Sequence, residues 1–231
     1  MKEFAIVNIA VAQNDSWYHR GQMRLRLSLE SVGALERCDL VFSRRETAET
    51  SCAYEDKMLA IRRAAEMGYK KILWLDCSIT AIRSIDDMLN WIEKEGYYMY
   101  RSGYNACQTA SDAALKFYNI SRDEAEKHPE CASNVVGLNL ENEKGYNLYI
   151  NWMNSIGSGL IDTIKFPNEG QRKLYSLDER FLHCRQDQEM ISISSINAKC
   201  SMQDHNHFVC RNEGDFKPTE SVIFMLKGGD Y

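Results

Sequence analysis

Residues 70–79, KKILWLDCSI, place four large apolar side chains directly before a single carboxylate, Asp76. A near-continuous apolar run is typical of a strand that is buried on both faces, as in the parallel sheet of an α/β protein. An acid at the end of such a strand needs a cation, a hydroxyl group or the start of a helix as its partner. Ligands bind at the carboxyl ends of the strands in an open parallel sheet, so Asp76 is a candidate site residue.

The segments on either side alternate between strand and helix patterns, which predicts an α/β fold with a Rossmann-like, mostly parallel central sheet and helices on both faces. In the first predicted helix, Met23, Leu27 and Val32 recur at helical spacing and are expected to face the core. The later chain is less regular, and the polar, irregular stretch 157–178 is a predicted loop. We expect strands at 4–12, 38–43, 70–76, 97–102, 133–140 and 221–226, and helices at 20–32, 54–69, 84–96, within 111–128, at 141–156 and, amphipathic, at 185–200.

Composition narrows the class of protein. The chain has 231 residues, a formal net charge of −5 and 44% hydrophobic residues, which is ordinary for one globular domain over 1–231. That charge gives no electrostatic reason to bind a polyanion over a broad face. No apolar run approaches the roughly 20 residues of a membrane span. The first apolar run is predicted to be a core strand and not a signal peptide. None of the eight cysteines forms a CxxC pair, which predicts reduced thiols and a cytoplasmic location.

Two further clusters carry groups that could do chemistry. Asp187, within 183-HCRQDQ-188 at a predicted helix start, is either a general base for a sugar hydroxyl or an acid that complements the helix dipole. His205 and His207 follow Asp204, a set that suits a transition metal or Mn²⁺ but is also common in solvated loops.

Two cations lie at unusual places along the chain. Arg24 and Lys57 are near the starts of predicted helices, where a cation is electrostatically unfavourable unless it faces an anion. Pairing with Asp15, Glu30 or Glu55 on the surface is the alternative. Asp76 has an alternative too, because an acid after a strand can cap the following turn.

Four stretches, 10–31, 54–79, 135–152 and 179–193, together resemble the GT-A-type nucleotide-sugar glycosyltransferases, specifically a loosely defined group of small bacterial and phage sequences. The resemblance spans most of residues 4–200 and implies a GT-A fold with a nucleotide-sugar-binding half (1–103) and an acceptor-side half (104–231).

The resemblance also implies roles for individual residues. Asp76 would approach the donor ribose or a metal between the phosphates. Lys57 would contact the nucleotide, and Arg24 its base or phosphates. Asp187, with Gln188, would lie beside the sugar and the acceptor.

One position departs from the family pattern. The usual Asp-x-Asp motif reads Asp76-Cys77-Ser78 here, and a serine hydroxyl brings no negative charge to a hard cation. A divalent metal, Mn or Mg, would then be held by Asp76, water and His207, with Ser78 in the donor site. In a metal-free version, cationic side chains and helix N-termini would stabilise the departing diphosphate.

The expected function is therefore transfer of a sugar from a nucleoside diphosphate sugar to a hydroxyl acceptor. A nucleotidyltransferase is disfavoured, because residues 10–21 hold a single glycine and no Gly-rich phosphate loop. A non-enzymatic nucleotide-sugar or carbohydrate-binding module of the same fold is the remaining alternative. The acceptor is left open between a glycan, a lipid-linked glycan, a protein and a hydroxylated DNA base, although the acidic charge disfavours DNA.

Overall fold

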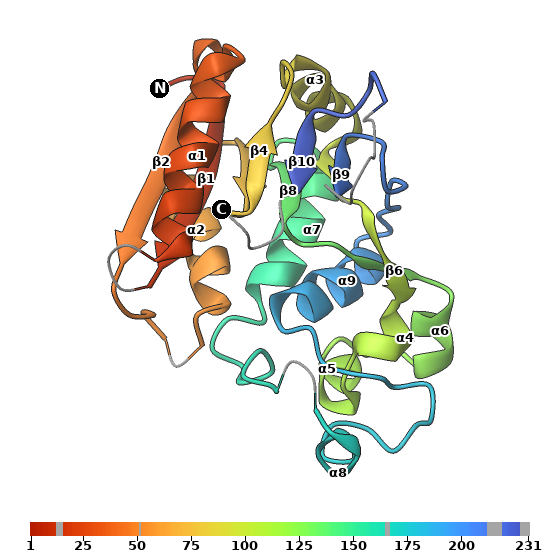
Figure 1. Ribbon diagram of the computed structural model, residues 1–231. Coiled ribbons are helices and arrows are strands. Elements are labelled where there is room, and N and C mark those ends of the chain that lie inside the picture. Colours follow the sequence, from red (N-terminus) through yellow and green to blue (C-terminus); the bar gives the residue numbers. More distant parts are fainter. Residues whose placement is uncertain (13–15, 51, 165–166, 212–218, 227–231) are drawn as a thin grey trace.

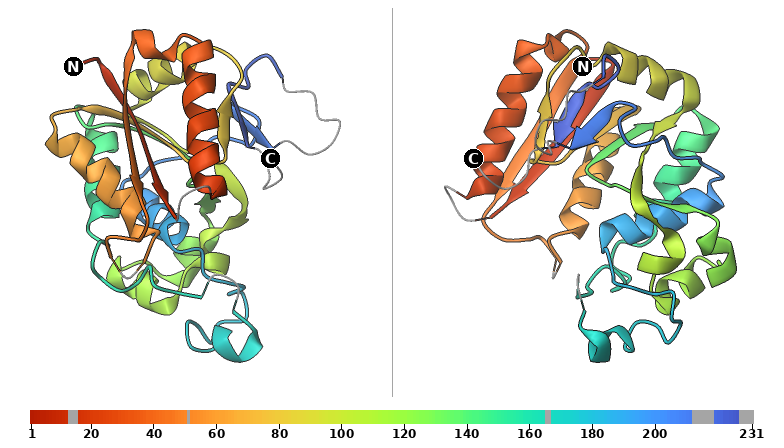
Figure 2. Two further views of the ribbon diagram at one scale, coloured as in Figure 1. Left: turned by 60° about the vertical axis from the view of Figure 1, so that its left-hand side comes forward. Right: turned by 45° about the vertical axis from the view of Figure 1, so that its right-hand side comes forward.

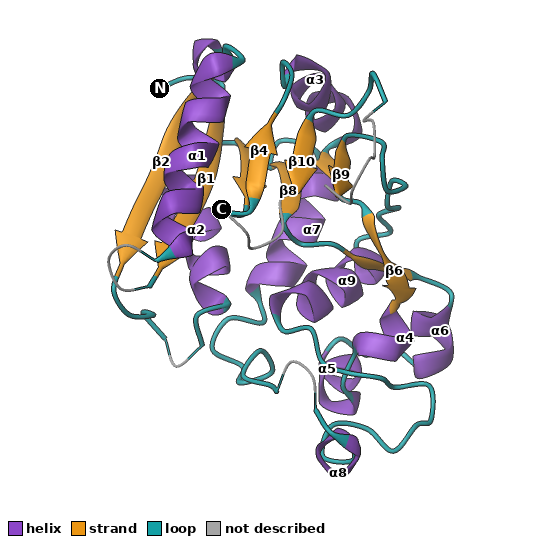
Figure 3. Cartoon of the chain, in the orientation of Figure 1, coloured by secondary structure: helices purple, strands orange, loops and turns teal. Residues whose placement is uncertain are grey.

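A computed structural model describes residues 1–12, 16–50, 52–164, 167–211 and 219–226 of the chain (Figure 1). Strands and helices alternate through its first half, and the second half is richer in short helices and loops, as the colours of Figure 3 show. The elements are β1 (Phe4–Val11), α1 (Trp17–Ser31), η1 (Ala34–Glu36), β2 (Cys38–Arg45), α2 (Glu55–Glu66), β3 (Lys71–Leu75), β4 (Ile79–Ala81), α3 (Asp86–Glu95), β5 (Tyr97–Tyr98), β6 (Arg101–Asn105), α4 (Ala106–Thr109), α5 (Asp112–Phe117), α6 (Arg122–Glu126), β7 (Pro129–Cys131), β8 (Val135–Asn139), α7 (Glu143–Met153), α8 (Glu169–Arg172), α9 (Asp187–Asn197), β9 (Val209–Arg211) and β10 (Phe224–Leu226).

The central sheet has the strand order β2-β1-β3-β8-β5. Strands β1, β2 and β3 are parallel to one another, whereas β8 runs antiparallel to both of its neighbours. Strand β3 lies in the middle of this sheet, and Ile72, Leu73 and Leu75 are fully buried. The predicted α/β architecture with a mostly parallel sheet is confirmed.

Each face of the sheet has its own hydrophobic core. Successive residues of a strand point to opposite faces, so that Val7 and Ile9 of β1 meet α2, α7 and α9, while Phe4 and Ile6 meet α1 and α3. A small sheet of order β4-β10-β9 covers the second face beside α1. The two views of Figure 2 show these layers. In the described part of the chain, no helix is long and apolar enough to cross a membrane.

The inner face of α1 differs from the prediction. Met23 and Leu27 are 44% and 57% exposed, whereas Leu25 and Leu29 are fully buried together with Gln22. Gln22 can be buried because its amide donates to Asn8 Oδ1 and to the Ser43 carbonyl, both at 2.8 Å. The helix is thus turned so that a hydrogen-bonded polar side chain lies under it, which the apolar spacing did not indicate.

Two other predicted elements also change. The predicted strand 97–102 is divided, because β5 ends at Tyr98 and β6 pairs with β7 in a separate two-stranded sheet. Helix α9 is not amphipathic: Ser192, Ser194 and Ile193 are all buried, so the helix is enclosed on every side.

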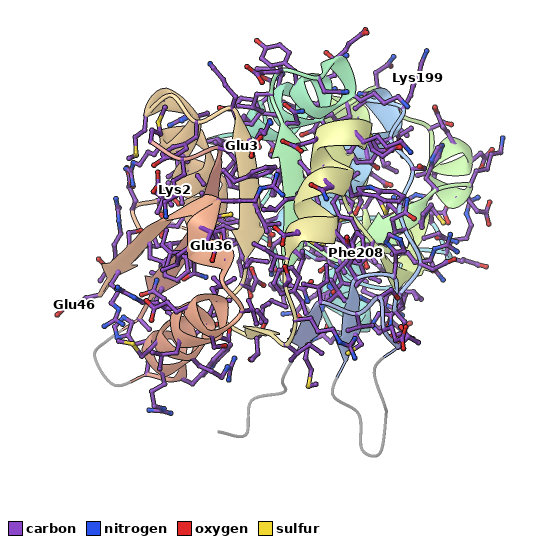
Figure 4. All side chains as sticks on the ribbon, turned by 90° about the horizontal axis from the view of Figure 1, so that it is seen from above. Lys2, Glu3, Glu36, Glu46, Lys199 and Phe208 are labelled. Atoms are coloured by element: carbon purple, nitrogen blue, oxygen red, sulfur yellow. The ribbon has the colours of Figure 1, made fainter. Side chains whose placement is uncertain are left out.

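The amino ends of the strands carry an exposed ion-pair network. Lys71 Nζ contacts Glu3 Oε1 at 2.7 Å and Glu93 Oε1 at 2.5 Å, and Arg37 contacts Glu3 at 3.2 Å. Figure 4 looks down on this edge and labels Glu3. These charges neutralise one another at the edge opposite to the carboxyl ends of β1 and β3.

Candidate functional site

A pocket of about 360 Å³ opens at the carboxyl ends of β1 and β3. The two strands supply its floor, and the first residues of α1, α2 and α9 supply its walls. All eight cysteines are unpaired and buried, and Cys77 is the one that lines this pocket. The lining residues are Ile9, Val11, Trp17, Tyr18, Ala53, Tyr54, Lys57, Trp74, Asp76, Cys77, Ser78, Ser133, Arg185, Gln186, Asp187 and Gln188.

Asp76 meets a cation and does not cap a helix. Its Oδ1 accepts a hydrogen bond of 2.6 Å from the indole nitrogen of Trp74 and lies 3.3 Å from Lys57 Nζ. The side chain of Asp76 remains 34% exposed toward the pocket. The apolar strand thus ends on a carboxylate that is held from one side and open on the other.

Lys57 joins Asp76 to the second predicted acid. Its ammonium group donates to Asp187 Oδ2 at 2.7 Å and to the carbonyl and hydroxyl oxygens of Ser133 at 3.0 and 3.1 Å. The same nitrogen lies 5.3 Å from the ring centroid of Trp74. Because Ser133 also donates to Asp187 Oδ2 at 2.8 Å, one oxygen of that carboxylate is fully engaged.

Burial and charge act against each other on these groups. Burial alone would lower the pKa of Lys57, but Asp187 and Asp76 raise it above its ordinary value, so the ammonium form persists. Burial raises the pKa of Asp76, and the nearby Lys57 lowers it in part. Lys57 therefore favours the charged form of Asp76 against the effect of burial.

A close helix–turn contact fixes the position of Asp76. A Cβ atom on Gly21 of α1 would lie 2.5 Å from the Cys77 carbonyl oxygen, so only glycine lets the helix approach the turn. Arg24, one helical turn further on, donates from Nη2 to the same carbonyl at 2.9 Å. Arg24 thus holds the turn after Asp76 and does not line the pocket, and its predicted contact with a nucleotide stays a prediction.

The pocket receives the N-termini of three helices. Trp17 and Tyr18 begin α1, Tyr54 precedes α2, and Asp187 begins α9. The free N–H groups and the positive dipole end of a helix N-terminus favour an anion. Lys57, Arg185 and the three helix starts therefore place positive charge beside the two carboxylates of this pocket.

Aromatic side chains form the outer wall, and this wall was not predicted. The rings of Trp17 and Tyr18 stack with centroids 4.2 Å apart, and Tyr18 and Tyr54 are 42% and 39% exposed. Aromatic residues just after a strand that ends at a site are the sequence signal that was available. Flat, exposed rings beside helix N-termini suit a planar base attached to phosphate.

The other predicted residues separate into two groups. Gln188 and Ser78 line the pocket with Asp76 and Asp187. His207 lies elsewhere, with its ring 4.9 Å from Trp91 and 4.1 Å from Phe208. It is not among the residues that line the pocket.

The described residues of the pocket do not fit a divalent cation. A hard cation takes several oxygen ligands, and in nucleotide sites it is usually held by one or two carboxylates together with the phosphates of the substrate. Asp76 is already bound by Lys57 and Trp74, Asp187 is bound by Lys57 and Ser133, and Ser78 is neutral. Within the described ranges, no three His, Cys, Asp or Glu side chains gather as a metal site.

The chain is similar to known proteins in the structure of its backbone. No family model and no curated protein matches the sequence. A glycosyltransferase involved in the glycosylation of the major capsid of PBCV-1 matches with a TM-score of 0.55 at 10% identity, over 96% of this chain and 92% of that one. Mouse xyloside xylosyltransferase 1 matches with a TM-score of 0.53 at 12% identity, over 97% of both chains.

A third similar structure has its ligands bound. The galactosyltransferase LgtC, in complex with donor and acceptor sugar analogues, matches with a TM-score of 0.52 at 9% identity, over 97% of this chain and 86% of that one. Likeness at such low identity concerns the course of the backbone. In its sheet order, its layers and its similar structures, the chain has the GT-A-type fold of glycosyltransferases.

Proposed function

We propose that the chain is a glycosyltransferase that moves a sugar from a nucleoside diphosphate sugar to a hydroxyl group. The observation that carries this proposal is the geometry of Lys57, which lies 3.3 Å from Asp76 and 2.7 Å from Asp187 in one open pocket. The GT-A-type fold supports the same reaction class, because the similar structures include glycosyltransferases.

The donor is assigned to the pocket by charge and shape. The base would lie against Tyr18 and Tyr54, whose exposed rings form the outer wall. The diphosphate would lie near the starts of α1, α2 and α9, where helix N-termini and Arg185 favour negative charge. Asp76 would then meet the ribose or the sugar, since its open side faces the same space.

Asp187 is the residue that we assign to the reacting end. Its Oδ2 is taken by Lys57 and Ser133, so Oδ1 would meet a hydroxyl of the sugar or acceptor. In the transfer, the acceptor oxygen bonds to the anomeric carbon, the bond from that carbon to the diphosphate breaks, and the hydroxyl proton passes to Oδ1 of Asp187. Positive potential from the helix starts stabilises the departing diphosphate. No step is assigned to a metal ion.

A binding module that lacks transferase activity is the alternative. It would need the pocket but not a charged Asp187. The buried contact of Lys57 with Asp187 argues against it, because ionisable side chains that meet in a cleft are typical of catalytic sites.

Release of nucleoside diphosphate tests the proposal. We expect purified protein to hydrolyse or transfer at least one sugar from a panel of nucleotide sugars, with and without Mn²⁺. Asp187→Asn should lower turnover at least about 100-fold, in line with the loss of a general base. Asp87→Asn, which changes an exposed acid on α3, is the matched control and should keep full turnover. A wild-type protein that turns over no donor in the panel would overturn the proposal.

A further inference from the structure

A second cavity, of about 320 Å³, lies between α5 and the loops on either side of α8. It shares no lining residue with the donor pocket. We call it the outer cavity. Its lining residues are Ser111–Ala113, Gly159, Leu160, Asp162, Thr163 and 173–177.

The first turn of α9 holds the donor pocket and the outer cavity together. Gln186, from the donor pocket, donates its amide to the Thr163 carbonyl of the outer cavity at 2.9 Å. Glu189, fully buried, accepts from both the backbone N–H and the hydroxyl of Ser111 at 2.8 Å. Asp187 lies between these two anchors in the sequence. The outer cavity is therefore held to the segment 186–189, which carries Asp187.

Two leucines that line the outer cavity are strongly exposed. Leu174 and Leu177 are 76% and 80% exposed, more than any other leucine among the described residues. Neither side chain covers the protein's own core. Large apolar side chains that are grouped at the mouth of a cavity indicate an apolar ligand group.

The wall of the outer cavity is polar. Asp112 remains 59% exposed while its Oδ1 accepts from Ser176 at 2.9 Å and from Arg122 at 2.5 Å. A partly free carboxylate held in this way is a hydrogen-bond acceptor for sugar hydroxyls. The cavity thus combines polar groups for a sugar with an apolar rim for what the sugar is attached to.

The geometry points to the outer cavity as the acceptor site, with preference for a sugar that carries an apolar aglycone. This inference rests on the proposed function for its place in the reaction, but binding can be measured without a donor. The acceptor hydroxyl would reach toward Asp187, and the aglycone would lie along Leu174 and Leu177.

Binding of alkyl glycosides tests this inference directly. The octyl and methyl β-glycosides of glucose, galactose and mannose are titrated into the protein below the micellar concentration, with calorimetry or ligand-observed NMR as the readout. We expect at least one octyl glycoside to bind 10-fold or more tightly than its methyl counterpart. The double variant Leu174→Ser/Leu177→Ser should abolish that preference.

Two controls keep the result specific. Leu27→Ser changes a leucine that is 57% exposed on α1, away from the outer cavity, and should leave the preference unchanged. Nucleoside diphosphate should bind equally to the wild type, the double variant and Leu27→Ser. A wild type that binds no nucleoside diphosphate would count against the proposed function and not against this site. Equal binding of octyl and methyl glycosides by the wild type, no binding of any, or a preference that survives the double variant would overturn the inference.

Discussion

Lys57 Nζ lies 2.7 Å from Asp187 Oδ2, although 130 positions separate the two residues in the sequence. The contact forms because α2 and α9 pack against the same face of the central sheet. Both side chains are buried, with 9% and 5% of their area exposed. The ion pair therefore joins the two halves of the chain at the wall of the donor pocket.

Removal of this lysine should cost stability as well as activity. We expect Lys57→Met to lower the free energy of unfolding by about 3–5 kcal/mol, because Asp187 is left as a buried charge without its partner. Urea unfolding at neutral pH measures the change. The double variant Lys57→Met/Asp187→Leu removes both charges and should recover most of the stability but none of the turnover. A loss below about 1 kcal/mol in the single variant would show that the pair is solvated.

Glu189 should make stability depend on pH. Burial raises the pKa of Glu189 to about 7 from 4.5. The folded protein thus keeps a proton that the unfolded chain releases, and stability falls as pH rises from 4.5 to 7. The shift corresponds to about 3 kcal/mol.

Glu189→Gln keeps an acceptor for Ser111 and removes the charge. We expect the variant and the wild type to be equally stable at pH 4.5, and the variant to be more stable by about 3 kcal/mol at pH 8. Urea unfolding at both pH values gives the difference, and exposed Glu141→Gln serves as the control. A difference that does not change with pH would contradict the assignment.

The contact between α1 and the turn after Asp76 gives a steric prediction. Gly21→Ala places a methyl group 2.5 Å from the Cys77 carbonyl oxygen, which α1 can relieve only by moving away. We expect a loss of about 1–3 kcal/mol in stability, together with weaker nucleotide binding. Thermal unfolding and calorimetry measure the two effects. Gly170→Ala has room for its methyl group and should behave like the wild type.

Some of this site could be predicted from the sequence and some could not. The sequence predicts Asp76 as a site residue because an acid directly after an apolar strand is easily recognised, and α/β sheets bind ligands at the ends of their strands. The contact of Lys57 with Asp187 was not found, because nothing local in either segment records which helices share a face of the sheet.

The wrong predictions for the buried face of α1 and for the amphipathic character of α9 have the same cause. The face of α1 was misjudged because buried Gln22 is satisfied by Asn8 and Ser43, which are distant in sequence. Helix α9 is enclosed on all sides, so its serines gave a false impression of a solvated face. Tertiary partners decided both cases, and a window of sequence does not contain them.

The aromatic wall gives a prediction for nucleotide affinity. We expect Tyr18→Ala to weaken binding of the nucleoside diphosphate about 10-fold, because stacking of a base on an aromatic ring contributes about 1–3 kcal/mol. Quenching of the fluorescence of Trp17 and Trp74, which line the pocket, reports the binding. Tyr146→Ala, a tyrosine that is 49% exposed on α7, is the control. An unchanged affinity in Tyr18→Ala would contradict the placement of the base against this ring.

Restoring the second acid of the Asp-x-Asp motif tests whether the neutral Ser78 limits binding of a divalent metal. We expect Ser78→Asp to bind Mn²⁺ at least about 10-fold more tightly than the wild type, because it adds a charged oxygen ligand beside Asp76. Electron paramagnetic resonance of free Mn²⁺ measures this binding without reference to turnover. A wild type that already binds Mn²⁺ as tightly as Ser78→Asp would mean that the neutral serine does not limit the site.

A crystal structure with the nucleoside diphosphate that most raises the melting temperature tests where the donor binds. We predict the diphosphate at the starts of α1, α2 and α9, the base against Tyr18, and the Lys57–Asp187 ion pair intact beneath them. A nucleotide bound elsewhere on the chain, with this pocket empty, would contradict it.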